Sequence, residues 1–354
     1  MNSEKNSRGK KRLNKPVKIV LIVLCVLAVL TGAAFGYVWI KLGLIQQSNG
    51  ELEGGSSTSS IKEIHEEDNL SEEELEGLTE QEVIHYKKGT VVSDKNVVNI
   101  LLLGTDERQK KFSDTARSDS MILVSVNFKK DTIKMVSFQR GMGVPILRGE
   151  YEGEYDWLTH CFNYGGASLV MDEIEHCYGI KIDHFVRVNF HTFQEAIDAV
   201  GGVTVNIDAY VADALNGITD DAAVVKHKVS AGENTLDGYD ALQFARVRHC
   251  DSDWKRVERQ RQVIQALMNK MKKMSFTELN SMLDAILPLI QTDMGRGDMM
   301  NYLFQVPSLI TGDTEQMTIP QKGTYGSMTG LGGRSMYSVD FDQNAEILIE
   351  FLYN

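Results

Sequence analysis

The longest apolar stretch of the chain lies near its beginning. Residues 19–40 read IVLIVLCVLAVLTGAAFGYVWI and contain no charged side chain. As a helix rising 1.5 Å per residue, this stretch would span roughly 33 Å, enough to cross the hydrocarbon core of a bilayer. Seven Lys or Arg but only one Glu occur in residues 1–18. The positive-inside rule therefore predicts a cytoplasmic basic tail, a transmembrane signal anchor and an extracellular C-terminal domain at the cell membrane.

A cleavable signal peptide is the alternative reading of the same stretch. Its apolar region would normally be about 7–15 residues long and would be followed by a small-residue cleavage site. The run over residues 19–40 is longer, and no clean A-x-A site follows it. We therefore favour an uncleaved anchor that crosses the membrane once.

The composition changes after the apolar stretch. Residues 48–60 (SNGELEGGSSTSS) have the composition of a flexible Gly/Ser linker, and residues 65–82 are strongly acidic. Runs of like charge are usually solvated, and negative charge would keep this segment away from an anionic membrane surface. We predict that residues 41–94 form a flexible acidic linker with one short exposed helix at most.

Strong alternation of strands and helices begins at Val97. The run VVNILLLG is continuously apolar, which predicts a strand covered on both faces, and SMILVSVNF and TIKMVSFQR predict a hairpin closed by KKD. Further strands are expected at HFVRVNF and VTVNI. Helices are expected at SLVMDEIEHCYGI, ending at Gly179, and at HTFQEAIDAV, ending at Gly201 and Gly202. This order predicts an α/β fold with layered α-β-α architecture and a mixed central sheet.

Positive charge is concentrated in one part of an acidic chain. The formal net charge is -12 and the pI is about 5.2, which argues against general binding of nucleic acid. Five arginines nevertheless fall within residues 246–261. On a helix predicted for residues 253–274, Arg256 and Gln260 would share a face with apolar residues further along. This face suits a ligand with a charged head and an apolar body, although an ordinary amphipathic helix would show the same pattern.

The cysteine and histidine patterns give no metal or redox motif. Cys161, Cys177 and Cys250 have no CxxC spacing, so one disulfide with a free thiol and three reduced thiols both stay open. His160 has no second histidine at metal-binding spacing, and we expect a core or hydrogen-bonding role for it.

Eight segments in order resemble the LytR–CpsA–Psr family of cell-envelope proteins. They run from Val97 to Met274, about half of the chain, and the predicted signal anchor agrees with the topology of that family. The resemblance identifies residues 95–275 as the catalytic core and 276–354 as a C-terminal extension of the same domain. The matching segments are residues 99–109, 116–127, 134–146, 159–169, 179–193, 199–207, 231–249 and 253–262.

The resemblance implies a phosphotransferase of cell wall biogenesis. Such an enzyme moves a glycopolymer, of teichoic acid or capsular polysaccharide type, from a polyprenyl-pyrophosphate carrier to peptidoglycan and forms a phosphodiester. Mg²⁺ or another divalent cation is implied as cofactor, with the lipid tail in an apolar pocket and arginines holding the pyrophosphate. Guanidinium groups suit this role because they stay charged and bind two phosphate oxygens at once.

The resemblance also implies roles for individual residues. Asp106 and Asp119 are expected to hold the cation, and Arg117, Arg140 and Asp119 to be catalytic. The predicted pyrophosphate-binding set is Arg117, Arg140, Arg246, Arg248, Arg256 and Gln260. If the RVR segment is extended, Arg246 and Arg248 can point to one pocket. Arg259 and Arg261 are expected to face solvent or to pair with neighbours such as Glu258.

Two departures from the family pattern leave alternatives open. The family usually has Pro-Arg-Asp where this chain has Gln139-Arg140-Gly141, and commonly a lysine where Trp157 stands. A polyprenyl-pyrophosphate-binding scaffold with weak or no turnover, or a polyprenyl-pyrophosphate phosphatase, are therefore the alternative functions. A role as a transcriptional attenuator finds no support, since no DNA-binding motif is visible.

Overall fold

The computed structural model describes residues 36–51, 69–107, 111–113, 116–218, 223–248, 250–309 and 314–354. The basic tail predicted for residues 1–18 and most of the span predicted for residues 19–40 lie outside the described residues. Within those described, no helix has both the length and the apolar character needed to cross a membrane.

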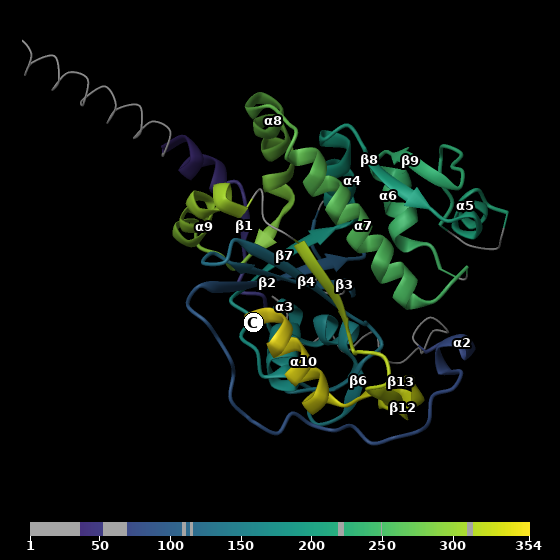
Figure 1. Cartoon of the computed structure of the whole chain (residues 1–354). Coiled ribbons are helices and arrows are strands. Elements are labelled where there is room, and N and C mark those ends of the chain that lie inside the picture. The colour runs from purple at the N-terminus through teal and green to yellow at the C-terminus, as the bar shows by residue number, and fades with distance from the viewer. Residues whose placement is uncertain are drawn as a thin grey trace, which may run out of the picture.

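A seven-stranded mixed sheet forms the centre of the molecule (Figure 1). Antiparallel pairing joins β2 to β3 and β3 to β4, whereas β2 pairs with β7 and β4 with β11 in parallel. The predicted hairpin and the mixed sheet are therefore confirmed. In order across the sheet, the strands are β1 (Gln46–Gln47), β10 (Gln291–Thr292), β7 (His184–Asn189), β2 (Val97–Thr105), β3 (Ser118–Asn127), β4 (Thr132–Phe138) and β11 (Thr314–Ile319).

The strand register brings four chain segments to one end of this sheet. Gly104 of β2 lies opposite Ser120 of β3, and Ile122 of β3 lies opposite Ser137 of β4. The end of β2, the start of β3 and the end of β4 therefore meet there. The end of β7 joins them, because β7 runs parallel to β2.

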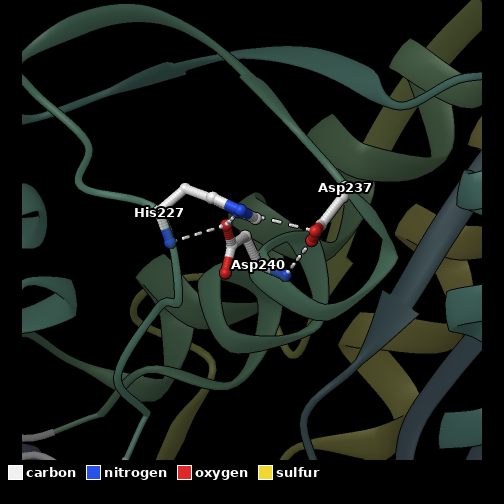
Figure 2. Close-up of side chains that lie close together, drawn as sticks. All are labelled: His227, Asp237 and Asp240. Atoms are coloured by element: carbon white, nitrogen blue, oxygen red, sulfur yellow. Dashed lines mark hydrogen bonds and ion pairs between the residues drawn. The ribbon is translucent and has the colours of Figure 1, made fainter.

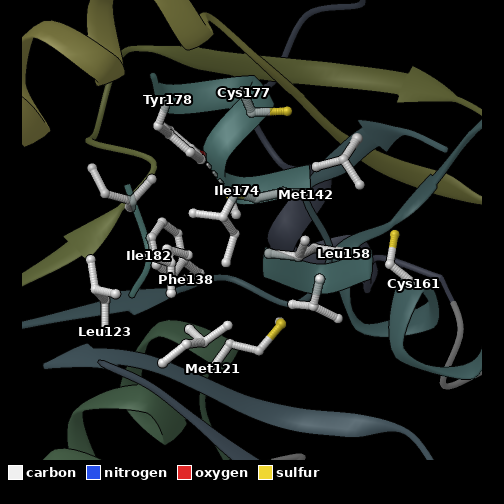
Figure 3. Packing of buried hydrophobic residues seen from close by; sticks show 14 of the residues in the cluster. Met121, Leu123, Phe138, Met142, Leu158, Cys161, Ile174, Cys177, Tyr178 and Ile182 are labelled. Carbon is white, nitrogen blue, oxygen red and sulfur yellow. Dashed lines mark hydrogen bonds between the residues drawn. The ribbon is translucent and has the colours of Figure 1, made fainter. Parts of the chain in front are cut away.

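One face of the sheet carries the main hydrophobic core. Helices α3 (Leu158–Tyr178) and α10 (Phe341–Tyr353) cover it, and Figure 3 shows side chains from β3, β4 and α3 packed together. Leu101 and Leu123 are fully buried in this cluster. The predicted end of α3 is confirmed, because Gly179 has the left-handed conformation (φ 60°) that closes a helix.

The opposite side carries a second layer with its own core. Within the described residues, its buried apolar side chains come from the helices, one hairpin and the loops that join them, with no contribution from the central strands. Its elements are α4 (Phe190–Ala199), β8 (Val203–Ile207), α5 (Ala209–Leu215), β9 (Gly232–Leu236), α6 (Gly238–Arg246), α7 (Asp253–Met271) and α8 (Phe276–Ile286).

The C-terminal part ends in a strand, a glycine-rich turn, a second strand and a helix. β12 (Tyr325–Thr329) and β13 (Ser335–Val339) form a hairpin before α10. Sequence analysis did not anticipate α8, α9 (Arg296–Leu309) or β11, although Ser275 and Glu278 form a capping box at the start of α8. Five short elements remain: α2 (Glu72–Leu75), β5 (Gly143–Pro145), β6 (Tyr155–Trp157) and the 3₁₀ turns η2 (Leu287–Leu289) and η3 (Leu331–Gly333).

The expectation of a flexible linker over residues 41–94 is wrong for residues 46–47, which form β1 of the central sheet, and for residues 69–94. Leu70 is only 6% exposed and belongs to the main core. Isolated β-bridges join Glu80 to Ser327 and Val92 to Ile180. The apolar side chains of this acidic segment are widely spaced, and each packs separately against the domain. Such spacing has no helical or strand periodicity, so the sequence did not predict this packing. Residues 52–68 lie outside the described part.

The three cysteines that the structure describes are all reduced. Cys161 and Cys177 are buried, and Cys250 is half-buried. The alternative of three free thiols is therefore confirmed. Buried thiols of this kind act as small hydrophobic side chains.

Glu173 of α3 predicts a measurable pH dependence of stability. Its Oε1 accepts the backbone N–H of Leu147 at 2.8 Å, and burial raises the pKa of the carboxyl from 4.5 to about 8. The folded state thus holds the proton more tightly, so this contribution to stability is complete below pH 4.5 and is lost as the pH rises towards 8. We expect Glu173→Gln, which keeps the acceptor, to gain roughly 3 kcal/mol over the native chain between pH 5 and 8. Chemical denaturation at several pH values measures this gain, and parallel stability curves would refute the assignment.

Candidate functional site

A cluster of charged side chains lies at the end of the sheet, below the first turn of α7. Asp119 is the second residue of β3, and Arg140 follows β4 by two residues. Asp253 opens α7, and Arg256 lies one turn further along that helix. The antiparallel register of β3 and β4 explains why Asp119 and Arg140, 21 positions apart in sequence, become neighbours.

Arg140 bridges the two acids of this cluster. Its Nη1 lies 3.9 Å from Asp119 Oδ1, and its Nε lies 3.4 Å from Asp253 Oδ1. Arg256 Nη2 approaches the same Asp253 oxygen at 2.7 Å. Two guanidinium groups therefore converge on one carboxylate.

Arg248 belongs to the same electrostatic group. Burial alone would raise the pKa of Asp119, but Arg140, Arg248 and other arginines outweigh it and hold the pKa below its ordinary value. The pKa of Asp253 is likewise lowered against the effect of burial by Arg256, Arg140 and Arg248. Both carboxylates are therefore ionised at neutral pH, and the arginines around them leave a net positive site.

Arg256 is the most constrained member of the cluster. It is 3% exposed, and burial lowers its pKa to about 9, with Arg248 and Arg140 adding to the shift and Asp253 opposing it. Among the described residues, no hydrogen-bond partner meets Arg256 Nε or Nη2, or Asp253 Oδ2. Arg256 Nη2 already pairs with Asp253 Oδ1, and Asp253 Oδ2 is itself an acceptor, so Arg256 Nε is the buried donor that remains available to an acceptor-rich ligand. The N-terminus of α7 adds its positive dipole end at the same place.

Asp106 and Arg117 connect this cluster to the end of β2. The Asp106 carboxylate accepts the backbone N–H of Arg117 at 3.0 Å. Burial raises the pKa of Asp106, and the negative charge of Asp119 adds to this effect, so the two predicted cation-binding acids act on each other electrostatically. Carboxylate oxygens are the ligands that Mg²⁺ prefers, and Mg²⁺ commonly uses one or two of them together with substrate phosphates. The donor set at Asp106 and Asp119 therefore fits this cation.

Arg246 and Gln260 lie near the cluster in different surroundings. The expected extended conformation around Arg246 is not observed, because α6 continues to this residue. The Arg246 guanidinium lies 4.7 Å from the ring centre of Phe190, which directly follows β7. Gln260 is half-buried and follows Arg256 by one helical turn, so both share a face of α7. The condition under which Arg246 and Arg248 were expected to point to one pocket, an extended segment, is therefore not met at Arg246.

Arg259 and Arg261 are both buried, so the expectation that they face solvent is wrong, whereas the alternative of an ion pair with a neighbouring acid holds for Arg259, through Asp251. Arg259 donates to the backbone carbonyls of Phe244 and Val247 and pairs with Asp251. Arg261 donates to Thr318 Oγ1 at 2.6 Å, on β11. Long side chains can reach satisfied positions inside a protein, which helical periodicity alone does not reveal. These two arginines tie α7 to α6 and to the sheet.

Trp157 provides an aromatic surface for Arg140. The Arg140 guanidinium lies 5.0 Å from the Trp157 ring centre, and His160 stacks on the same indole with ring centres 5.7 Å apart. A Cβ atom at Gly141 would lie 3.6 Å from the Trp157 ring and 3.0 Å from Leu70. The two positions that depart from the family pattern are therefore in contact with each other.

His160 has the hydrogen-bonding role that the sequence predicted. Its Nδ1 lies 3.1 Å from Asp156 Oδ1, and Asp156 also pairs with Arg334 at 3.0 Å. Burial would raise the pKa of Asp156, but hydrogen bonding and the charges of His160 and Arg334 hold it below its ordinary value. This buried group supports Trp157 from the side of the core.

Asp253 is the site residue that sequence analysis missed. In the sequence it stands at the start of the helix predicted for residues 253–274, where acidic residues are common for electrostatic reasons. Its spacing of three residues from Arg256 was the available signal, because such pairs meet on one helix face. The contact with Arg140 depends on tertiary structure and has no local signature.

A strip of accessible apolar side chains lies on the sheet face that α4 and α7 overhang (Figure 1). Leu101 and Leu103 of β2 are fully buried towards α3, whereas the alternate residues Ile100 and Leu102 stay partly accessible. The strand is therefore covered closely on the α3 face and only in part on the other. Helix α7 instead packs against α6 and β8. Leu102 lies opposite Ile122, three residues after Asp119 on β3, so this apolar surface lies near the charged cluster.

A second polar group lies on the helical layer, away from this cluster. Figure 2 shows His227, Asp237 and Asp240, which in the described part of the chain are the only three metal-ligating side chains whose ligand atoms lie within 4.8 Å of one another. Asp240 is buried and accepts the backbone N–H of Lys226 at 2.7 Å and contacts His227 Nδ1 at 2.7 Å. Asp237 caps α6. These bonds account for the group as a loop anchor.

Comparison with known proteins places the chain among envelope proteins. The model of the LytR_cpsA_psr family matches residues 52–350. The polyisoprenyl-teichoic acid–peptidoglycan teichoic acid transferase TagU of Oceanobacillus iheyensis is 39% identical over 57% of this chain and 60% of its own length, less than two thirds. TagU of Bacillus licheniformis is 30% identical over 84% of this chain and 83% of its own. The solved structure of TagT bound to LIIa-WTA matches with a TM-score of 0.58 at 25% identity, over 76% of this chain and 97% of its own.

The different surroundings of Arg256 and Arg259 predict different effects on stability. Arg259→Met removes donors from two carbonyls and leaves Asp251 without its partner, so we expect a loss of about 3 kcal/mol. Arg256→Met removes a desolvated charge whose Nε lacks a partner, and Asp253 keeps Arg140, so the loss should stay below about 1 kcal/mol. Urea unfolding of the full chain in detergent measures both values. A larger loss for Arg256→Met would show that this arginine is mainly structural.

Proposed function

This chain belongs to the LytR–CpsA–Psr family, and on that premise we propose that it transfers a glycopolymer from a polyprenyl-pyrophosphate carrier to peptidoglycan. The polymer is of teichoic acid or capsular polysaccharide type, and the new bond is a phosphodiester. The names of the relatives support this class of substrate, since they are polyisoprenyl-teichoic acid–peptidoglycan teichoic acid transferases. The chain is thus proposed to be an enzyme of cell wall biogenesis.

One observation carries the proposal most strongly. At the cluster, the buried donor Arg256 Nε has no hydrogen-bond partner among the described residues, and Arg140 and Arg256 converge on the single carboxylate of Asp253. A diphosphate offers several acceptor oxygens and about two negative charges to such a site. Arg140, Arg248 and Arg256 would bind these oxygens, and Arg117 would approach from the start of β3. Arg246 and Gln260 would contact the outer part of the same ligand.

The proposed reaction exchanges one phosphoester bond for another. A hydroxyl of peptidoglycan attacks the phosphorus that carries the polymer, and the bond from this phosphorus to the carrier phosphate breaks. The leaving polyprenyl phosphate takes the electron pair, and the hydroxyl proton passes to Asp106, the acid of the two whose pKa is raised. Arg140 and Arg248 stabilise the charge that develops on the phosphate oxygens. The guanidinium groups are held in place before the ligand arrives, which favours the transition state.

Asp106 and Asp119 are the residues that would hold Mg²⁺ or another divalent cation. When bound, such a cation neutralises phosphate charge and orients the diphosphate. The lowered pKa of Asp119 keeps this carboxylate ionised and available as a ligand. Asp106 is held in position by its bond to the Arg117 backbone.

The location of the reaction is also proposed. The carrier is a membrane lipid, so the domain would work at the outer surface of the cell membrane, held by a single span over residues 19–40. The accessible apolar strip beside Ile100 and Leu102 would receive the polyprenyl tail, because apolar surface favours contact with hydrocarbon over water. This arrangement places the charged head and the tail of the carrier on adjacent surfaces.

A scaffold with little turnover is the second candidate function. The observation that favours it is the pair Gly141 and Trp157, which replaces two charged side chains of the family pattern with a glycine and an apolar ring. An acid at position 141 would have to displace Leu70, which lies 3.0 Å from the position of its Cβ. Against this candidate, Asp253 and Trp157 still orient Arg140. The phosphatase alternative would use the same site with water as acceptor.

Arg140→Ala is expected to abolish transfer and leave the fold intact. Removing one preorganised charge from a phosphoryl-transfer site costs on the order of 100-fold or more in turnover. The assay uses the full chain in detergent with a polyprenyl-pyrophosphate-linked glycan, Mg²⁺ and peptidoglycan fragments. A new phosphodiester indicates transfer, free phosphate indicates hydrolysis, and tight binding without either indicates a scaffold.

The matched control for this variant is Arg148→Ala. Arg148 is about half-exposed and pairs with Asp172 on the outer side of α3, so its loss should not change turnover. Circular dichroism of both variants checks that the fold is kept. Unchanged turnover in Arg140→Ala would remove the proposed mechanism.

Trp157 is expected to position Arg140 through its ring. Trp157→Leu removes the ring face and should lower kcat about tenfold, whereas Trp157→Phe keeps a face and should restore most of it, since a desolvated cation–π contact contributes about 1–2 kcal/mol. Both variants lose the Nε1–H bond to the Ser335 carbonyl, so comparison of the two cancels that effect. Equal kcat values for Leu and Phe would refute a positioning role.

A further inference from the structure

The connection between α7 and α8 combines positive charge with exposed apolar side chains. Lys272, Lys273 and Phe276 are all exposed, and Lys270 and Met274 are partly exposed beside them. We call these five residues the basic–aromatic surface. Such a concentration of lysines is notable in a chain with a net charge of -12. Phe276 is 80% exposed, more than any other large hydrophobic side chain in the described part of the chain.

This surface lies beside the segment through which the chain leaves its N-terminal apolar stretch. Residues 36–42 form a helix that contacts α8 through Tyr37 with Asn280 and Lys41 with Asp284. Both pairs advance by four residues, so the two helices run in the same direction. Phe276 therefore lies one turn beyond Asn280, on the side from which the chain arrives.

Exposed apolar side chains gather on the same end of the molecule. Residues 36–44, α8 and α9 lie together there, as Figure 1 shows. Gln46 Nε2, just after the N-terminal helix, donates to the Pro288 carbonyl after α8 at 2.7 Å. Six of the eleven exposed large hydrophobic side chains in the described residues are on these elements: Tyr37, Trp39, Ile40, Leu44, Phe276 and Leu303.

We propose that the basic–aromatic surface docks on a lipid bilayer that contains anionic headgroups. Lysines attract an anionic lipid surface, and an adjacent aromatic ring can insert at the level of the headgroups. Tyr37 and Trp39 have the amphipathic rings that are typical of this interface. Isolated surface lysines are usually only solvated, but here the same few residues also expose Phe276, and the predicted span ends beside them. Charge complementarity and this continuity with the span select the bilayer as the partner.

Docking would fix the orientation of the site relative to the membrane. Helix α7 carries Arg256 near its N-terminus and leads to the basic–aromatic surface at its C-terminus, about 27 Å from end to end at 1.5 Å per residue. This step rests on the proposed function. With the surface docked, the far end of the polyprenyl tail would stay in the bilayer while the diphosphate of the same carrier reaches the arginines. The docking itself does not depend on transfer chemistry.

A spin label at Thr277→Cys in the full chain tests the docking. Cys25 and Cys250 are changed to serine, and the chain is placed in lipid nanodiscs with or without phosphatidylglycerol in phosphatidylcholine. A second label at Lys322→Cys serves as the reference position. In discs that contain phosphatidylglycerol, we expect a water-soluble nickel complex to reach the label at position 277 about threefold less than the label at position 322. Phe276→Ser, or Lys272→Glu with Lys273→Glu, should restore access.

The matched control reverses the same number of charges elsewhere. Lys95→Glu with Lys228→Glu changes two exposed lysines outside the surface and should leave position 277 protected. Equal access at positions 277 and 322 in both kinds of disc would overturn the proposal. Protection that arises in phosphatidylcholine discs only after a soluble polyanion such as polyphosphate is added would assign the surface to a polymer and would also overturn it. A chain protected at 277 but inactive in transfer would instead contradict the proposed function alone.

Discussion

The site depends on holding several guanidinium groups close together where little water can screen them. Arg140, Arg248 and Arg256 repel one another, and the lowered pKa of Arg256 expresses that repulsion together with the effect of burial. Asp119 and Asp253 offset part of it, and the rest has to be supplied by the fold. The β3–β4 register fixes one side of the cluster, and the first turn of α7 fixes the other. Stacking of Trp254 on Tyr325, with ring centres 5.6 Å apart, holds that turn against the C-terminal hairpin. The C-terminal hairpin thus helps to fix the position of the first turn of α7, which carries Asp253 and Arg256.

The two faces of the central sheet differ in how closely they are packed. The face below α3 and α10 is closely packed and gives the domain its stability. The opposite face is overhung by helices that have their own core. Those helices therefore do not depend on close packing against Ile100 and Leu102 for their stability. A domain with one fully packed face can tolerate accessible apolar surface on the other. That division makes it physically reasonable for a charged site and an apolar strip to lie next to each other without loss of the fold.

Local patterns predicted much of the fold but little of the site geometry. Strand β2, the β3–β4 hairpin and the end of α3 at Gly179 follow from apolar runs, turn residues and a glycine cap, all of which act within a few residues. The packing of residues 69–94 and the burial of Arg259 depend on partners far away in the sequence, so periodicity could not reveal them. Asp253 was missed for the same reason. The resemblance to a family supplied the candidate arginines, whereas which of them share one carboxylate became visible only in three dimensions.

The exchange at Gly141 and Trp157 is best understood as one change in how Arg140 is held. Position 141 has no side chain, and the space beside it is occupied by Leu70 and the Trp157 ring. The ring lies against the Arg140 guanidinium on one side and His160 on the other, while Asp253 binds the guanidinium Nε. An arginine held by an aromatic face and by Asp253 and Asp119 has fewer competing carboxylates than one with a further acid beside it in sequence. More of its charge is therefore available to a phosphate ligand, so the departure from the family pattern is compatible with a working site.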